Sequence, residues 1–297
     1  MAVVKDQVTV IVPTFNEEKA IGLVLDELYQ EGYSDILVVD NYSTDATVKI
    51  VNSKEVKVIQ QHGRGKTGAL KTAIEHVKTP YMLVMDGDYT YDPRDIRKFL
   101  VHIENFDEII GVRKNGAENI PRLNRFGNKV ITKVFNLLMG ANLSDVCSGM
   151  YMLKTEAARQ LSLESGGFEA EVEIASQMVT QGKVTEVPIN YRKRRGIQKL
   201  SRIKDGFKIA TSILKLARAY NPALLFSTLA ATAFIPGIII LAWVAFRVIF
   251  YGIWHSGYAL FGTMLLLFGS QGLAVATISV LLKRMEQRTK RRLSVHE

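Results

Sequence analysis

The two acids best suited to chemistry are Asp86 and Asp88, in the stretch "MDGDYTYDP". They follow an apolar run and one residue separates them, so both carboxylates can face the same way at the end of a strand. Two ionised carboxylates this close repel each other unless a cation lies between them. Mg²⁺ and Mn²⁺ take oxygen ligands from one or two carboxylates and from phosphates. The pair therefore predicts a site for Mg²⁺ or Mn²⁺; the alternative is a surface turn rich in Asp and Gly.

A glycine-rich stretch, "HGRGKTGAL" at residues 62–70, is a second candidate for phosphate binding. Its glycines spell G-x-G-x-x-G, but a Rossmann fingerprint opens the first βα turn, and two βα units precede this one. Its G-K-T resembles the end of a Walker A motif, but that motif requires glycine where Gln60 stands. We therefore expect neither an NAD site nor an ATPase. The remaining interpretations are a ligand-free turn and a turn that brings Lys66 towards a nucleotide diphosphate.

Four short apolar runs alternate with helical patterns in the first part of the chain. The runs are residues 8–12, 35–40, 56–61 and 81–86. Such alternation predicts an α/β fold with a doubly wound, mostly parallel sheet. Ligands of such sheets bind beyond the carboxyl ends of the strands. The polar residues expected at those ends are Asn16, Glu17, Asp40, Asp45, Asp86 and Asp88.

Two long uncharged segments lie in the C-terminal third. Residues 223–246 make 24 uncharged positions and residues 258–282 make 25. Each exceeds the roughly 20 residues that span about 30 Å of hydrocarbon. Neither shows the polar face of a helix in a soluble protein. We expect a two-helix transmembrane hairpin over 223–282; two buried core helices are the alternative.

The formal net charge of +9 is concentrated beside this hairpin. The tail 283–297 carries six Lys or Arg, and residues 201–222 mix apolar side chains with Lys, as in an interfacial amphipathic helix. The loop 247–257 has one Arg and one His. The positive-inside rule then predicts an integral membrane protein whose N-terminal region and C-terminus are cytoplasmic. Attraction to anionic headgroups explains the charge better than nucleic-acid binding.

The remaining signals agree with a cytoplasmic catalytic region. The first 15 residues are a short apolar run interrupted by Lys5 and Asp6, which indicates a strand and not a signal peptide. Cys147 is the single cysteine, so an intrachain disulfide and a cysteine metal cluster are both excluded.

Four motifs occur in order, each after a predicted strand: "VPTFNEE", "VVDNYSTDAT", "GRGKTGALKTA" and "MDGDYTYDP". Together they resemble the family 2 glycosyltransferases of the GT-A fold. More narrowly they resemble the polyprenyl-phosphate hexose synthases, the group of dolichyl-phosphate mannose synthase. The resemblance covers residues 8 to about 200 and implies a GT-A glycosyltransferase domain over 1–200.

The resemblance implies a role for each nucleotide-side residue. Nucleotide contacts would come from Pro13, Phe15, Glu17, Asp40, Lys66 and Asp86, with Asp40 reading the base or ribose. Asp86 and Asp88 would hold the metal and the diphosphate. The sequence departs from the usual "VDDGSTD" at Asn41 and Tyr42. It also has Thr90 where the dolichyl enzymes often have Gln.

The acceptor half of the family resembles "GVRKNGAENIPRLNRFGNKV", "LSDVCSGMYMLKTEA" and the basic loop "VPINYRKRRGIQKL". Asp145, Ser148 and Gly149 match a "TD-x-x-SG" stretch, and Gln198 replaces the Ser of a final "SKL". The implied acceptor-phosphate contacts are Arg113, Arg125, Arg192, Arg194 and Lys199. The implied catalytic residues are Asp88, Arg113, Arg125, Ser148 and Lys199. The alternatives are solvated arginines and, for the loop, attraction to a lipid surface.

The resemblance implies an inverting transfer of a hexose from a nucleotide sugar, of GDP-mannose or UDP-glucose type, to polyprenyl or dolichyl phosphate. The Q-x-x-R-W motif of synthases that extend hydroxyl acceptors is absent from the sequence. A lipid phosphate is already an anion, so it requires cations and not a general base. One alternative is transfer to a hydroxyl of a lipid or lipid-linked glycan, with Glu169, Glu171 or Glu173 as base. A second is a non-catalytic, nucleotide-binding membrane scaffold, and a third is a nucleotidyltransferase. The sequence leaves the sugar, the base, the polyprenol and the oligomeric state open.

Overall fold

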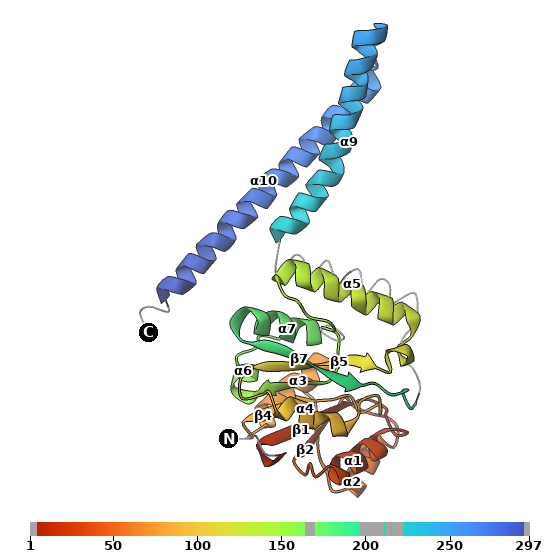
Figure 1. Ribbon diagram of the computed structural model, residues 1–297, viewed down its shortest axis with the longest axis vertical. Helices are drawn as coiled ribbons and strands as arrows, with labels where there is room; N and C mark the ends of the chain where they lie inside the picture. Colours follow the sequence, from red (N-terminus) through yellow and green to blue (C-terminus); the bar gives the residue numbers. More distant parts are fainter. Residues whose placement is uncertain (1–4, 164–169, 197–210, 212–214, 216–221, 294–297) are drawn as a thin grey trace. The chain divides into compact units, whose positions relative to one another are not determined.

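The computed structural model describes residues 5–163, 170–196, 211, 215 and 222–293 (Figure 1). The chain divides into two compact units, Met1–Ser212 and Ile213–Glu297. The first unit contains every motif discussed above, and the second contains two long apolar helices. The interfacial helix predicted at 201–222 falls almost wholly outside the described residues. That helix and the proposed segment limits therefore stay predictions.

The first unit is built on a seven-stranded sheet with the order β3-β2-β1-β4-β6-β5-β7. Its strands are β1 (Val8–Thr14), β2 (Ile36–Asp40), β3 (Lys57–Gln60), β4 (Tyr81–Val84), β5 (Glu108–Asn115), β6 (Tyr151–Lys154) and β7 (Val184–Asn190). Strands β1 to β4 pair in parallel, as do β5 and β7, and β6 runs antiparallel to β4 and β5. The α/β fold with a mostly parallel sheet is thus confirmed.

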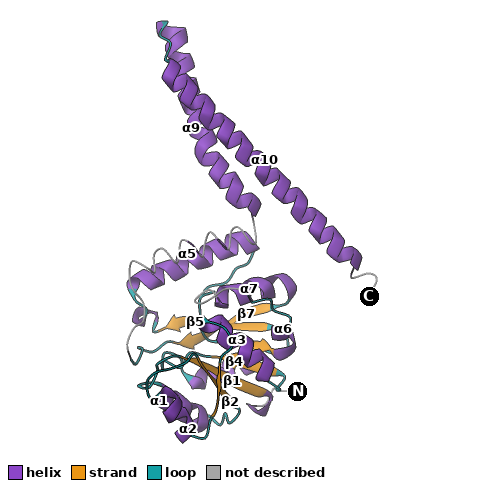
Figure 2. Cartoon of the chain, turned by 180° about the vertical axis from the view of Figure 1, so that it is seen from behind, coloured by secondary structure: helices purple, strands orange, loops and turns teal. Residues whose placement is uncertain are grey.

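Helices cover both faces of this sheet (Figure 2). One core contains side chains of α1 (Ile21–Gln30), α2 (Thr47–Ser53) and α4 (Ile96–Leu100). The other contains α3 (Gly65–His76), α6 (Thr155–Arg159) and α7 (Ala170–Gln181). Successive side chains of a strand point to opposite faces, so Val10 and Val12 join the first core and Ile11 joins the second. The remaining elements are α5 (Arg122–Met139), η1 (Lys5–Gln7), η2 (Pro93–Asp95) and η3 (Ala117–Asn119).

Glu108, the first residue of β5, is a buried acid outside the motifs. Its side chain is 1% exposed, and the Oε2 atom has no hydrogen-bond partner among the described residues. Burial raises the pKa of Glu108 from its ordinary 4.5 to about 8. The folded chain therefore holds this proton more tightly than the unfolded chain does.

We expect Glu108 to make the protein less stable as the pH rises. Its contribution is complete below about pH 4.5, falls as the pH increases, and is lost once the pH passes the folded pKa near 8. In that window the free energy of unfolding should fall by up to about 1.4 kcal/mol per pH unit more in the wild type than in Glu108→Gln. Thermal melting of both proteins from pH 5 to 9 measures the difference. The same change of melting temperature with pH in both proteins would contradict this prediction.

The second unit is a hairpin of α9 (Pro222–Tyr251) and α10 (Ser256–Leu293). Glycines of α10 allow the two helices to approach closely. A Cβ atom added at Gly269 would lie 2.9 Å from backbone atoms of Phe234, and one at Gly272 would lie 2.8 Å from the Cβ atom of Ala230. Small residues at such contacts are typical of helices that pack in lipid.

Both helices are long and apolar enough to cross a membrane. The candidate spans are Leu225–Tyr251, with mean hydropathy 2.3, and Ser256–Leu282, with mean hydropathy 2.0. Only 11% of the most apolar window is buried in either span, so within the described hairpin most of their apolar side chains are exposed. Length and composition therefore agree with the predicted hairpin.

Candidate active site

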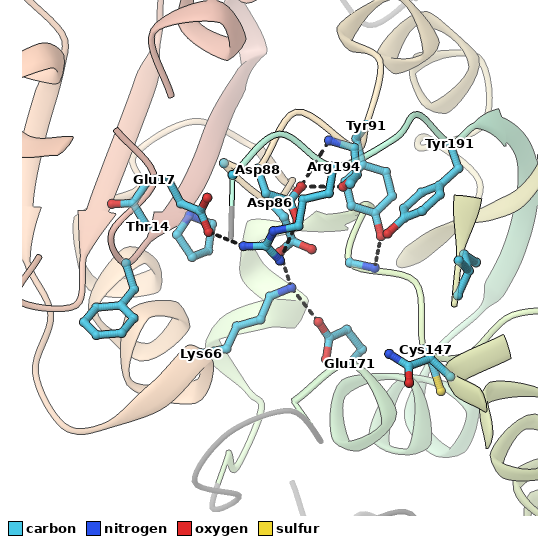
Figure 3. Close-up of a pocket in the computed structure, with 18 of the residues that line it drawn as sticks. Thr14, Glu17, Lys66, Asp86, Asp88, Tyr91, Cys147, Glu171, Tyr191 and Arg194 are labelled. Atoms are coloured by element: carbon cyan, nitrogen blue, oxygen red, sulfur yellow. Dashed lines mark hydrogen bonds and ion pairs between the residues drawn. The ribbon is translucent and has the colours of Figure 1, made fainter. Parts of the chain in front are cut away.

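A cavity of about 540 Å³ opens in the first unit where the parallel strands end. Strands β1, β2 and β4 are parallel, so their carboxyl ends share one edge of the sheet. The loops after β1, β2 and β4 line the cavity together with the start of α3. Further lining residues come from β5, the segment 119–121, α5 and α7, from Cys147 and Gly149, and from the segment 191–196. Figure 3 shows how side chains from these separate segments converge.

The acid pair lies in this cavity, and each acid faces a basic side chain. Asp86 Oδ1 accepts a hydrogen bond from Lys66 Nζ at 2.6 Å. Asp88 Oδ2 lies 3.1 Å from Arg194 Nη1. The other oxygen of Asp88 accepts hydrogen bonds from the hydroxyl of Thr90 at 2.5 Å and from its backbone N–H at 3.1 Å. Thr90 thus fixes the orientation of Asp88.

Two further acids complete a network around the same two cations. Lys66 Nζ also lies 2.5 Å from Glu171 Oε1, and Arg194 Nη2 lies 2.5 Å from Glu17 Oε1. Burial and the charge of Asp86 together raise the pKa of Asp88. Burial alone would lower the pKa of Lys66, but Asp86 and Glu171 outweigh it, so that pKa is raised well above its usual value. Lys66 is therefore charged at neutral pH.

Gly149 lies directly beside Asp86, where the space leaves no room for a side chain. A Cβ atom added at this position would come within 2.4 Å of Asp86 Oδ2 and 3.0 Å of Lys66 Nζ. Its backbone N–H donates to the hydroxyl of Tyr91 at 2.7 Å. That tyrosine in turn packs edge-on against Tyr191, with ring centroids 5.4 Å apart. The glycine of the "SG" pair is thus held beside the Asp86–Lys66 ion pair.

The residues expected to contact nucleotide are only partly together. Pro13, Phe15 and Glu17 line the cavity, as do Lys66 and Asp86. Asp40 is 0% exposed and does not line it. Its carboxylate accepts hydrogen bonds from Thr14 Oγ1 at 3.1 Å, Ser43 Oγ at 2.5 Å and Ser43 N at 2.8 Å. Asp40 holds the loop after β2 in place, and its neighbour Asn41 reaches the cavity instead.

On the acceptor side, Arg113 lines the cavity and is fixed by Asp145. Two hydrogen bonds of 2.7 Å join the guanidinium Nε and Nη2 to the Asp145 carboxylate. Arg125 lies on α5 but does not line the cavity; Asn124 and Asn128 of the same helix do. Ser148 is 1% exposed and also lies behind the lining, between Cys147 and Gly149.

The basic loop after β7 divides between two places. Arg194 points into the cavity, as Figure 3 shows. Arg192 lies in a separate hollow, where it forms ion pairs with Glu27 at 2.6 Å and Asp92 at 2.8 Å. Lys199 falls outside the described residues. Of the predicted acceptor cations, the structure therefore brings together Arg113 and Arg194.

Sequence reasoning gave no site role to several residues that the structure places in the cavity. Tyr91, Tyr191 and Lys193 line it. Lys193 is exposed, and no ion pair of it occurs among the described residues. Tyr91 belongs to the "MDGDYTYDP" motif, so its position beside the acid pair was available as a signal. For Lys193 the sequence contained no such signal beyond its place in a run of four basic residues.

Comparison with known proteins identifies the family. The model of the family "Glycosyl transferase family 2" matches residues 9–162, more than half of the chain. The chain belongs to glycosyl transferase family 2. Glycosyltransferase AglJ of Haloferax volcanii is 32% identical over 297 residues, covering 97% of both chains. The dolichyl-phosphate hexose transferase of the same organism is 35% identical and covers 71% of this chain and 94% of its own length.

A solved structure shows the same fold. Glucosyl-3-phosphoglycerate synthase of Mycobacterium tuberculosis, crystallised with Mn²⁺, UDP-glucose and phosphoglyceric acid, superposes with a TM-score of 0.58. It is 18% identical and covers 70% of this chain and 79% of its own length. The GT-A fold of this family 2 glycosyltransferase is thus confirmed, and the chain is a glycosyltransferase.

The cavity of this glycosyltransferase fits a divalent cation at the acid pair. Among the described residues, no three His, Cys, Asp or Glu side chains group into a complete ligand set. Asp86 and Asp88 would therefore supply two carboxylates, and diphosphate oxygens and water the rest, which is a ligand set that Mg²⁺ favours. Lys66 and Arg194 lie close to these carboxylates, which shows that the negative charge of the acid pair attracts cations.

Proposed function

We propose that this glycosyltransferase moves a hexose from a nucleotide sugar to polyprenyl phosphate at a membrane. One observation carries the proposal: among the residues that the structure describes, every acid that lines the cavity is already ion-paired. Lys66 pairs with Asp86 and Glu171, and Arg194 pairs with Glu17 and Asp88. A hydroxyl acceptor requires a free base to take its proton, whereas a phosphate acceptor requires none. The name of one relative, the dolichyl-phosphate hexose transferase, supports the same acceptor class.

The donor would lie across the loops after β1, β2 and β4. The exposed ring of Phe15, with Pro13 beside it, offers an apolar surface to the nucleoside, and Asn41 offers an amide at the same wall. The diphosphate would lie at Asp86 and Asp88, where a divalent cation, when bound, neutralises the leaving group. The proposed donors are nucleotide sugars of the GDP-mannose or UDP-glucose type. The position of Lys66 lets it stabilise negative charge that develops there.

The reaction would be a single displacement. A phosphate oxygen of the acceptor forms a bond to the anomeric carbon while the bond from that carbon to the diphosphate oxygen breaks. The nucleoside diphosphate leaves, and the configuration inverts. Arg113, held by Asp145, and Lys193 would orient the incoming phosphate. Holding both reactants in this geometry removes much of the entropic barrier.

The membrane assignment belongs to the same proposal. We place Leu225–Tyr251 and Ser256–Leu282 across the bilayer as an anchor. The basic tail would put the catalytic unit and the C-terminus on the cytoplasmic side. The segment 201–222, rich in apolar and basic residues, would connect the anchor to the catalytic unit along the surface.

Glu171→Gln separates this proposal from transfer to a hydroxyl. If the acceptor is a phosphate, the substitution removes one partner of Lys66 but no catalytic base, and we expect kcat to fall by less than about tenfold. A general base would contribute about 10²–10⁴-fold. Initial rates with polyprenyl phosphate measure the change, with Glu173→Gln, two residues further along α7, as the matched control. A loss of about a thousandfold confined to Glu171→Gln would favour the hydroxyl mechanism.

A further inference from the structure

One face of α5 (Arg122–Met139) carries apolar side chains that no described residue of the first unit covers. The side chain of Phe126 is 67% exposed, that of Leu137 is 68% exposed, and that of Leu123 is 42% exposed. At 3.6 residues per turn these three positions lie within one arc of the helix. Exposed apolar groups gathered on one face mark an interaction surface, whereas single ones do not.

The same helix is strongly basic. Its 18 residues include Arg122, Arg125, Lys129 and Lys133 and contain no Asp or Glu. Lys129 and Lys133 are exposed and lie one turn apart beside Phe126. A soluble helix usually mixes both signs of charge on its outer face. This one offers cations and apolar groups together, without an acid on the helix to neutralise them.

The opposite face of α5 belongs to the protein interior and to the cavity. Ile131, Phe135 and Leu138 are buried, and α5 packs beside α7 (Figure 1). Asn124 and Asn128, on the same side as Ile131, line the cavity. The helix therefore lies between the cavity and the surroundings that its outer face contacts.

We propose that the outer face of α5, defined by Leu123, Phe126, Lys129, Lys133 and Leu137, lies on an anionic phospholipid surface. Apolar side chains enter the boundary between headgroups and acyl chains, while flanking lysines reach anionic phosphates. A nucleic acid would pair its phosphates with the lysines but would leave the apolar side chains of Phe126 and Leu137 in water. The inference rests on the proposed membrane anchoring and goes beyond it, because it names a second contact with the lipid.

This contact would have a consequence for the acceptor. A helix with its side chains is about 10–12 Å thick. With its outer face on the headgroups, α5 would hold the cavity about one helix diameter from the lipid phosphates. A membrane-borne phosphate would then reach Arg113 without leaving the bilayer completely.

Spin labels at three positions test the inference in the full chain. The labelled variants are Phe126→Cys on α5, Asn52→Cys on the exposed surface of α2, and Ile239→Cys on α9. The native Cys147 lines the cavity and burial raises the pKa of its thiol, so the wild-type chain is treated with the label in parallel to measure any labelling at this position. Collision with oxygen, which is enriched in lipid, is compared with collision with a water-soluble nickel complex. Measurements use nanodiscs of phosphatidylglycerol and phosphatidylcholine, and detergent micelles.

In anionic nanodiscs we expect the labels at 126 and 239 to favour oxygen and the label at 52 to favour nickel. Lys129→Gln and Lys133→Gln should each lower the ratio of lipid-contacting to water-exposed label at 126 by about fivefold. That factor corresponds to roughly 1 kcal/mol per basic residue near an anionic surface. Lys49→Gln and Lys71→Gln, on exposed positions of α2 and α3, should leave it unchanged.

Three results would overturn the inference. A label at 126 that favours nickel while the label at 239 favours oxygen would show an anchored protein whose α5 stays in water. A label at 126 shielded from both reagents in lipid-free detergent would show that another part of the chain or a second copy covers α5. If the label at 126 is shielded from both reagents only when nucleic acid is added, the outer face of α5 binds nucleic acid and not lipid. If the label at 239 also favours nickel, the membrane anchoring itself fails.

Discussion

Asp88→Asn is expected to lower sugar transfer by about a thousandfold or more, the scale of losing a main electrostatic stabiliser of the leaving group. The carboxylate is one of two that face the proposed diphosphate position, and Thr90 holds it in place with two hydrogen bonds. The amide keeps the shape of the side chain but removes the charge. Binding of nucleoside diphosphate should consequently lose its dependence on Mn²⁺. Initial rates and calorimetric titration with and without Mn²⁺ measure both effects.

Asp26→Asn provides the matched control. Asp26 lies on α1 and pairs with Lys54 at the surface, outside the cavity lining. It should bind nucleotide and transfer sugar like the wild type. Wild-type transfer by Asp88→Asn would remove the acid pair from the mechanism, and an equal loss in both variants would indicate a general defect in folding.

Gly149→Ala is expected to have the second-largest effect, about a hundredfold, although it adds only one methyl group. The new Cβ atom would meet Asp86 Oδ2 at 2.4 Å and Lys66 Nζ at 3.0 Å, so the ion pair between them must move. Displacement of a catalytic group by about 1 Å can cost on the order of 10²-fold in rate. We expect kcat/KM to fall and the affinity for Mn²⁺ with nucleotide to fall with it, while the melting temperature changes little.

The comparison variant is Gly257→Ala, where an added Cβ atom meets nothing within 4 Å. It should leave all three measurements unchanged. Wild-type kcat/KM for Gly149→Ala would show that Asp86 and Lys66 need not keep their present positions during transfer.

The sequence predicted those features that depend on local pattern. Apolar runs flanked by polar residues located β1 to β4, and β1, β2 and β4 gave the clearest signal because a strand covered on both faces has little choice of residue. β2, for instance, is buried at every position. Asp86 and Asp88 were found for a similar reason, because one intervening residue at a strand end already places both carboxylates together. Two long uncharged segments were enough to predict α9 and α10.

Residues whose position depends on tertiary packing were harder to assign. Asp40 carries the charge expected of a nucleotide contact, yet it is buried under the loop that it stabilises, and Asn41 reaches the cavity. Arg192 and Arg194 are two positions apart, but one pairs with Glu27 outside and the other with Asp88 inside. Local spacing places neighbouring side chains relative to each other and does not show which of them faces the cavity.

The ion pairs around the cavity could not be predicted from the motifs alone. Glu171 was one of three acids considered as a base, and its 2.5 Å contact with Lys66 and its place in the cavity lining distinguish it from Glu173. That contact joins residues more than 100 positions apart along the chain, from α3 and α7. The exposed face of α5 was missed for a related reason, because its sequence mixes buried and exposed apolar residues.

The most direct test of the proposed function is transfer of labelled sugar by the full-length protein reconstituted in lipid. Purified protein, Mn²⁺ or Mg²⁺ and polyprenyl phosphate are incubated with labelled UDP-glucose, GDP-mannose and related donors in parallel. We expect one donor to give an organic-soluble product that releases its sugar in mild acid, and we expect none when polyprenol without phosphate replaces the acceptor. Equal transfer to polyprenol and to polyprenyl phosphate, or no lipid product with any donor, would contradict the proposed function.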